Sequence, residues 1–260
     1  TVRIDLKGVP GEGVEAKDVA LALLDRFGSN TLLGKAVEVY GPWVQKATLE
    51  ECITLSSMAT EMGAIILLVP PNGNVLEYCG MAREEAVYAD PDAAYRSRYS
   101  VDIDGLQPLV AAPFSPSNVS SISELAEVGV DTVFVGSCTN GTYADLRLAA
   151  ELLRGRRIAQ GVTLKVVPAT RKVWSRLLEE GLIADIFRAG GIVSNAGCGG
   201  CASGQIGMTG AGEVQVSTSN RNFKGKQGMG KTYLAGVGTA VASALVGRIS
   251  SVHDLKEVAE

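Results

Sequence analysis

The stretch TVFVGSCTNGTYADLRLAAELLRG, residues 132–155, decides the fold. Its first four residues are β-branched or aromatic and predict a buried strand, and the part from Thr142 onward has the apolar spacing of a helix. The following segments read as strand, helix and strand: TLKVVPA (163–169), RKVWSRLLEEGLIADIFRAG (171–190) and GIVSN (191–195). A β-α-β-α-β order predicts a mainly parallel sheet with right-handed crossovers.

The N-terminal part has the same alternation of strands and helices. VRIDLKG (2–8) and KAVEVYG (35–41) alternate like strands, and AKDVALALLDRFG (16–28) between them has helical spacing. Thr48 followed by Glu51 predicts a capping box and a helix running to about Gly63. The apolar run AIILLVP (64–70) after it predicts a buried strand.

Residues 88–123 interrupt this rhythm. They are rich in Asp, Pro, Ser and Tyr without a clear period, and AAPFSPSNVSS (111–121) is typical of a connector. We therefore expect an α/β protein made of two three-layer domains with mainly parallel sheets, residues 1–118 and 119–260.

Composition limits the partners and the location of the chain. The 260 residues carry a formal net charge of -4, which gives no general attraction to nucleic acid or to an anionic membrane. The apolar runs are much shorter than the roughly 20 residues that cross a bilayer, and no signal segment opens the sequence. We expect a cytoplasmic protein without a nucleic-acid or membrane partner. The start at Thr1, within an expected strand, suggests a fragment or a processed chain.

Three of the five cysteines follow expected strands directly. Cys138 comes after TVFVGS, and Cys198 and Cys201 come after GIVSNAG. Loops at the carboxyl ends of parallel strands converge, so these three thiols are expected to meet. An odd number of cysteines without an export signal argues against a disulfide framework. Cys52 and Cys79 are expected to be ordinary core residues.

The pair in NAGCGGCASGQ, residues 195–205, allows more than one interpretation. A structural zinc site needs a fourth ligand, and the single histidine, His253, is expected at a solvated helix start. A redox dithiol would not use Cys138. Three cysteines and an empty fourth position favour an iron–sulfur cluster with one open iron. The glycines between the sulfurs are expected to leave room for the cluster and a substrate.

The loop STSNRNFKGKQGMGK, residues 217–231, concentrates cations in an acidic protein. It is either a solvated flexible loop or a site for a multiply charged anion, because arginine grips a carboxylate by two parallel hydrogen bonds. It does not match the phosphate-binding pattern G-x-x-x-x-G-K-[ST]. Glu61, in MATEMGA, is on residue chemistry alone a surface group more often than a functional one.

The motifs VFVGSCTNG, CGGC and STSNRNFKGKQG together resemble the aconitase superfamily in order and spacing. Within it, the chain is most similar to the large-subunit group of the isopropylmalate dehydratases and their homoaconitase-like relatives. The similarity extends to AKDVALALL, MATEMGA and ASALVGRI, and so to nearly the whole chain.

This resemblance implies a [4Fe-4S] cluster held by Cys138, Cys198 and Cys201, whose open iron binds a substrate hydroxyl and carboxylate. It implies a hydro-lyase that dehydrates and rehydrates a hydroxy di- or tricarboxylic acid, as in leucine biosynthesis. Asn220 and Arg221 match substrate-site residues of the family, and Lys226 stands where a second arginine is usual. Glu61 matches a glutamate that acts at the departing hydroxyl.

Some features of the family differ or have no counterpart. Ser57 replaces an asparagine near the cluster, and Phe114 replaces a common histidine. The family's preceding segment, rich in Asp, His and Ser, has no counterpart here, and its catalytic serine lies on a swivelling domain that is expected as a separate small subunit. The alternatives are a homoaconitase or 2,3-dimethylmalate dehydratase subunit, a non-catalytic RNA-binding relative, and a structural zinc module.

Overall fold

The computed structural model describes residues 1–257, and the chain forms two compact units. Unit 1 comprises Thr1–Gln107 and unit 2 comprises Pro108–Glu260. The sequence places the division later, between residues 118 and 119. The segment between the two positions contributes strand β5 (Leu109–Ala111), which pairs antiparallel with β11 (Lys231–Ala235) in the sheet of unit 2.

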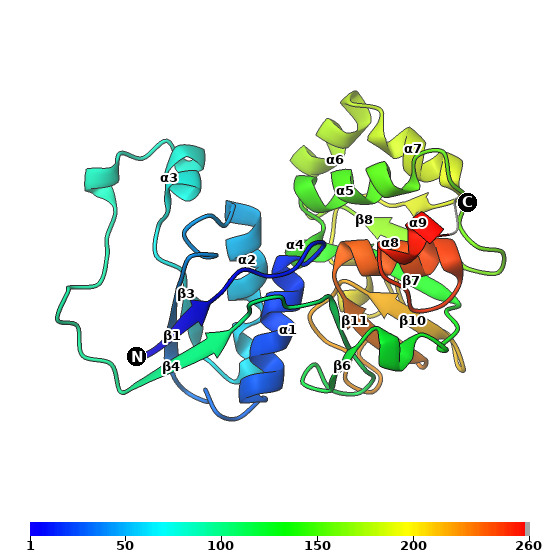
Figure 1. Ribbon diagram of the computed structural model, residues 1–260. Coiled ribbons are helices and arrows are strands. Elements are labelled where there is room, and N and C mark those ends of the chain that lie inside the picture. The colour runs from blue at the N-terminus through cyan, green and yellow to red at the C-terminus, as the bar shows by residue number, and fades with distance from the viewer. Residues whose placement is uncertain (258–260) are drawn as a thin grey trace. The chain divides into compact units, whose positions relative to one another are not determined.

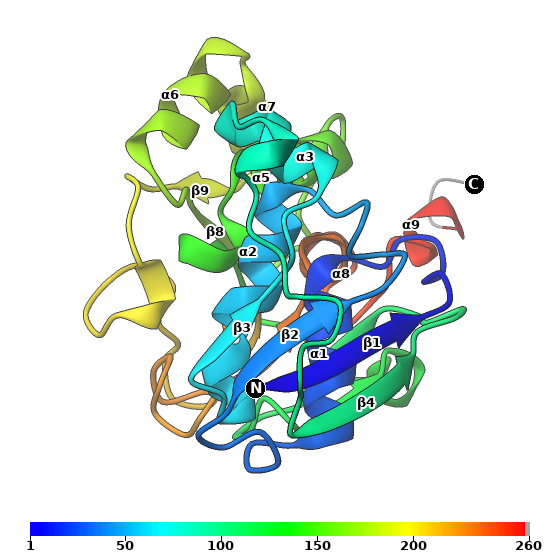
Figure 2. The ribbon, with the colours of Figure 1, turned by 90° about the vertical axis from the view of Figure 1, so that its left-hand side faces the viewer.

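Unit 1 is built on a four-stranded parallel sheet in the order β3-β2-β1-β4 (Figure 2). Its strands are β1 (Val2–Lys7), β2 (Ala36–Tyr40), β3 (Ile66–Leu68) and β4 (Ser97–Asp102). Its helices and 3-10 turns are α1 (Ala16–Phe27), α2 (Leu49–Ser57), η1 (Ala59–Met62), α3 (Gly73–Cys79) and η2 (Arg83–Glu85). Figure 2 shows α1 and α2 behind the strands.

Two details of unit 1 refine the sequence predictions. The capping box at Thr48 is confirmed, because Glu51 N–H donates to Thr48 Oγ1 at 3.2 Å and Thr48 N–H donates to the Glu51 carboxylate at 2.7 Å. The helix that begins there ends at Ser57 and continues as the separate turn η1. Strand β3 buries Leu67 alone, because Ile66 and Leu68 point to the opposite, exposed face of the sheet.

Unit 2 is built on a seven-stranded sheet in the order β6-β5-β11-β10-β7-β8-β9, parallel except at β5 and β6 (Figure 1). Its further strands are β6 (Val119–Ser121), β7 (Thr132–Gly136), β8 (Thr163–Val167), β9 (Ile192–Val193) and β10 (Val214–Ser217). Its helices and turns are η3 (Ser123–Leu125), α4 (Ser137–Asn140), α5 (Tyr143–Leu153), α6 (Arg171–Glu179), α7 (Leu182–Ala189), η4 (Gly199–Cys201), α8 (Val237–Val246) and α9 (Asp254–Glu257).

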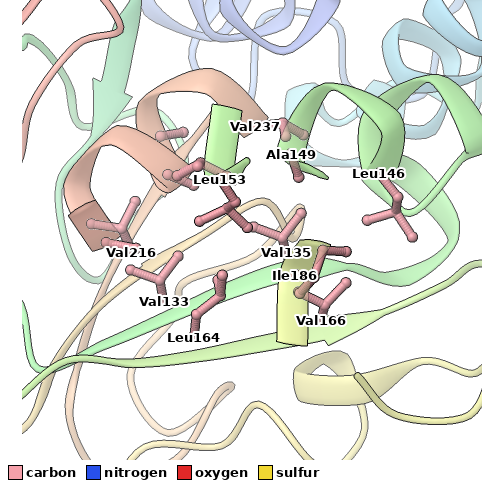
Figure 3. Close-up of a cluster of buried hydrophobic side chains, with 14 of the residues drawn as sticks. Val133, Val135, Leu146, Ala149, Leu153, Leu164, Val166, Ile186, Val216 and Val237 are labelled. Atoms are coloured by element: carbon pink, nitrogen blue, oxygen red, sulfur yellow. The ribbon is translucent and has the colours of Figure 1, made fainter. Parts of the chain in front are cut away.

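The core of unit 2 lies between its sheet and α5, α7 and α8, and it consists of aliphatic side chains (Figure 3). The strand residues that face these helices include Val133, Val135, Val166 and Val216, and the helices contribute Leu146, Leu153, Ile186 and Val237. The expected helix 171–190 is broken into α6 and α7 at Gly181, whose φ of 74° is left-handed.

The α/β class with mainly parallel sheets, predicted from the sequence, is confirmed. The longest helix among the described residues, α1, has 12 residues. No helix within residues 1–257 is therefore long and apolar enough to span a bilayer.

Candidate functional site

The site is organised by the neighbouring strands β7 and β10 of unit 2. The chain leaves β7 toward β8 on one side and leaves β10 toward β11 on the other, so the two carboxyl ends form a topological switch point. In open α/β sheets ligands bind in the crevice at such a point. The two ends are joined by hydrogen bonds, since Thr218 N–H donates to Phe134 O and Gly136 N–H donates to Thr218 Oγ1, both at 3.0 Å.

The turn after β7 carries Cys138. A Cβ on Gly136 would lie 2.1 Å from the carbonyl oxygen of Val167, so the close approach of β8 requires glycine there. Ser137 follows with a φ of 70°, a left-handed conformation that costs a residue with a side chain about 1–2 kcal/mol. This turn begins α4 and leaves Cys138 exposed. Backbone strain is therefore concentrated beside a candidate ligand, as it often is at functional sites.

The C-x2-C turn, residues 198–201, packs on the sheet through its glycines. Gly199 has a φ of 53°, and a Cβ there would lie 2.6 Å from the ring of Phe134 in β7. A Cβ on Gly200 would lie 2.7 Å from the carbonyl oxygen of Gly207. The side chain of Gln205 accepts a hydrogen bond from Gly199 N–H at 3.1 Å. Gly199 thus lets the turn pack against β7 and Gly200 lets it pack against Gly207, roles that the sequence interpretation did not include.

The three candidate cysteines lie on adjoining turns, because α4 contacts η4. All three are free thiols; Cys138 and Cys198 are exposed and Cys201 is half-buried. Within residues 1–257, no three Cys, His, Asp or Glu side chains are grouped as a metal would require. The donor set nevertheless suits an iron–sulfur cluster in its chemistry, since it consists of three unpaired thiols from two neighbouring turns.

The two remaining cysteines differ from each other. Cys52 is buried as predicted, and burial, with a smaller contribution from the charge of Glu51, raises its pKa to about 11. Cys79 is exposed at the end of α3, so its assignment to the core is wrong.

The loop after β10 lies beside the C-x2-C turn. Asn220 and Arg221 are half-buried there, and Lys226 Nζ donates a hydrogen bond to the carbonyl oxygen of Cys201 at 2.9 Å. Lys226 thus ties this loop to the C-x2-C turn. The sequence prediction did not include Gln227, whose Nε2 donates to the carbonyl oxygen of Arg221 at 2.6 Å and whose Oε1 accepts from Ser217 Oγ at 2.9 Å.

Asn222 is a second supporting residue that sequence reasoning missed. It is 2% exposed, and its Nδ2 donates to the carbonyl oxygens of Ala112 (2.7 Å) and Thr232 (3.1 Å). The backbone carbonyl oxygen of Asn222 accepts a hydrogen bond from Phe114 N–H at 3.1 Å. Phe114 is exposed and has a left-handed φ of 79°. The supporting role of Asn222 and Gln227 could have been predicted only from their positions within the motif, because neither residue type is distinctive in a polar loop.

Glu61 belongs to unit 1, in the turn η1. It is 5% exposed, so the interpretation as an ordinary surface group is wrong. The Thr60 hydroxyl donates to Glu61 Oε1 at 3.2 Å, and Ser57 Oγ donates to the carbonyl oxygen of Thr54 at 2.9 Å. A buried carboxyl group is costly unless neighbouring groups compensate it, which makes Glu61 a candidate for a functional role.

Comparison with known proteins agrees with this arrangement. The model of the aconitase family (aconitate hydratase) matches residues 1–247. The 3-isopropylmalate dehydratase large subunit 1 of Methanopyrus kandleri is 40% identical over 255 residues, which cover 96% of this chain and 61% of that protein. The 3-isopropylmalate dehydratase large subunit of Pyrobaculum islandicum is 42% identical over 253 residues, covering 95% of this chain and 60% of the relative.

Among solved structures, holo aconitase X of Thermococcus kodakaraensis matches with a TM-score of 0.52 at 18% identity, over 98% of this chain and 54% of that one. At this identity the match supports the fold alone. The chain spans about three fifths of the length of the curated relatives it matches. The match to the family model nevertheless covers almost every element of both units, and it confirms the resemblance seen in the motifs: the chain belongs to the aconitase family.

Proposed function

We propose that this chain is the cluster-binding part of the large subunit of a cytoplasmic hydro-lyase. Its substrate class would be hydroxy di- or tricarboxylic acids of the 3-isopropylmalate type, and its partner a small swivelling-domain subunit. The observation that carries the proposal is the placement of three free thiols and Arg221 around the switch point of β7 and β10. The names of the relatives support the reaction and the small-subunit partner.

In this proposal Cys138, Cys198 and Cys201 hold a [4Fe-4S] cluster. When bound, the cluster supplies a Lewis-acidic iron that polarises the hydroxyl group and a carboxylate of the substrate. Arg221 grips a carboxylate through two parallel hydrogen bonds, and Asn220 contributes a neutral amide beside it. Lys226 offers only a point charge, and it is already bound to the Cys201 carbonyl oxygen, so it holds the C-x2-C turn and adds positive potential.

Glu61 is proposed to protonate the departing hydroxyl group, which leaves as water. The base that removes the proton from the adjacent carbon is expected on the small subunit. In hydration the same groups act in reverse, so that Glu61 accepts a proton from the incoming water.

The first test is anaerobic reconstitution of the chain with ferrous iron and sulfide, followed by absorbance and EPR. We expect a broad visible absorbance that is lost in Cys138→Ser, Cys198→Ser and Cys201→Ser. Cys79→Ser is the matched control, because Cys79 is also an exposed free thiol but lies in unit 1. Stoichiometric zinc without iron would contradict the proposal and favour a structural zinc module.

The second test measures activity after the reconstituted chain is mixed with the small subunit of a relative. Isopropylmaleate, cis-homoaconitate, cis-aconitate and dimethylmaleate are each offered, and loss of their conjugated absorbance reports hydration. Turnover of isopropylmaleate is expected, and a preference for another acid would identify a homoaconitase or dimethylmalate dehydratase subunit. The absence of turnover with all four would remove the enzyme assignment.

A further inference from the structure

Lys17 is fully buried in unit 1, in an unusual position for a lysine. It is the second residue of α1, where the positive end of the helix dipole opposes a cation. Desolvation of the ammonium group is a further cost. A charged group retained under both conditions needs compensation from buried partners, and its surroundings show what it supports.

The ammonium group lies at the junction that carries Glu61. Lys17 Nζ is 3.7 Å from Met58 Sδ. Met58 closes α2 and opens η1, and its carbonyl oxygen accepts a hydrogen bond from Glu61 N–H at 3.1 Å. Lys17 therefore supports the residue from which the turn bearing Glu61 begins.

The buried charged residues of unit 1 also link Lys17 to Glu61. Among the described residues of unit 1, the buried carboxyl groups belong only to Asp18 and Glu61, which are 1% and 5% exposed. Asp18 Oδ2 accepts the backbone N–H of Glu15 at 2.7 Å and so caps α1. Lys17 is the only cation buried with them in this unit. Its removal would take a buried positive charge away from a unit that buries two carboxyl groups.

We infer that Lys17 is a positioning residue for Glu61. Its ammonium group compensates the carboxylate form of Glu61, which accepts a proton in hydration and is left after the proton is given up in dehydration. It also fixes the junction between α2 and η1, so that Glu61 keeps one orientation. The inference rests on the role of Glu61 in the proposed function.

The test is a double-mutant cycle of Lys17→Met and Glu61→Gln in this chain, measured by urea unfolding with far-UV circular dichroism. Lys17→Met is expected to lower the folding equilibrium constant, the ratio of folded to unfolded protein, at least tenfold in the wild-type background and less than threefold in the Glu61→Gln background. Lys172→Met is the matched control with an effect below threefold, because Lys172 is also the second residue of its helix, α6, but is exposed.

Equal effects of Lys17→Met in the two backgrounds would overturn the inference. If Lys17→Met alone does not fold, a folded double variant supports the coupling and an unfolded one overturns it.

Activity of the enzyme assembled with its small subunit gives the second readout, at a temperature at which all variants are folded. Lys17→Met is expected to lower kcat at least tenfold with KM within twofold, and to add less than twofold to the loss in Glu61→Gln. A purely structural role would lower activity equally in both backgrounds. Full activity of Glu61→Gln would refute the proposed role of Glu61 while leaving the stability coupling intact, so the two failures are distinguishable.

Discussion

Gly199→Ala is the substitution that most directly tests how the C-x2-C turn is held. Gly199 has a φ of 53°, a conformation that costs an alanine about 1–2 kcal/mol. The added methyl group would lie 2.6 Å from two ring carbons of Phe134 and 3.0 Å from Val167 Cγ2. Phe134 is fully buried, so the ring has little freedom to move, and overpacking of this kind costs about 1–3 kcal/mol. The free energy of unfolding should fall by about 2–5 kcal/mol.

Gly204→Ala is the matched control in the same loop. Gly204 is also left-handed, with a φ of 78°, but a Cβ there would meet nothing within 4 Å. It should lose only the backbone contribution of about 1–2 kcal/mol. The difference between the two variants in urea unfolding therefore isolates the contacts with Phe134 and Val167. A loss in Gly199→Ala no larger than that in Gly204→Ala would refute the conclusion that this turn is packed on β7.

Two further predictions concern single residues. Ser137→Gly should raise the free energy of unfolding by about 1 kcal/mol, because glycine adopts the observed φ of 70° without strain; an unchanged or lower urea midpoint would argue against strain at this turn. Cys52 should resist iodoacetamide at pH 8 while Cys79 reacts, as read by mass spectrometry, since burial raises the pKa of Cys52 to about 11. Below its ordinary pKa of 9.0, Cys52 is neutral in both the folded and the unfolded chain, and the stability is unaffected by its titration. As the pH rises from 9.0 toward 11, the thiol ionises in the unfolded chain first, so the free energy of unfolding falls. Cys52→Ala should flatten this fall.

The sequence predicted the regular part of the fold because its period is strong there. Strand β7 is buried on both faces, which is visible as an unbroken apolar run, and helix α5 buries one apolar face, which is visible as helical spacing. Strands β5 and β6 were missed because each has three residues and lies among Pro and Ser, which are typical of connectors. β6 pairs with β5, and the pairing of β5 with β11 is long-range, so local sequence carries no signal for it.

The candidate site was predicted in part, for a related reason. Counting strand ends was enough to bring Cys138 near the C-x2-C turn, because the topology of a parallel sheet places all carboxyl ends at one edge. The burial of Glu61 was not predicted, because it depends on how η1 follows α2. The packing of Gly199 on Phe134 depends on a side chain more than sixty residues away, which spacing cannot reveal.

The structure divides the motif STSNRNFKGKQG into side chains that are buried and hydrogen-bonded and side chains that are proposed to bind the substrate. Ser217, Asn222 and Gln227 are buried, and their side chains are bonded within unit 2. Asn220 and Arg221 lie between them, half-buried. Most of the motif is therefore a scaffold that fixes the backbone of Arg221, through the hydrogen bond from Gln227 to its carbonyl oxygen above all. In the proposed function, in which Arg221 binds a substrate carboxylate, a loss of Gln227 should weaken that binding nearly as much as a loss of Arg221, because a guanidinium group binds two carboxylate oxygens only when its backbone is held in place.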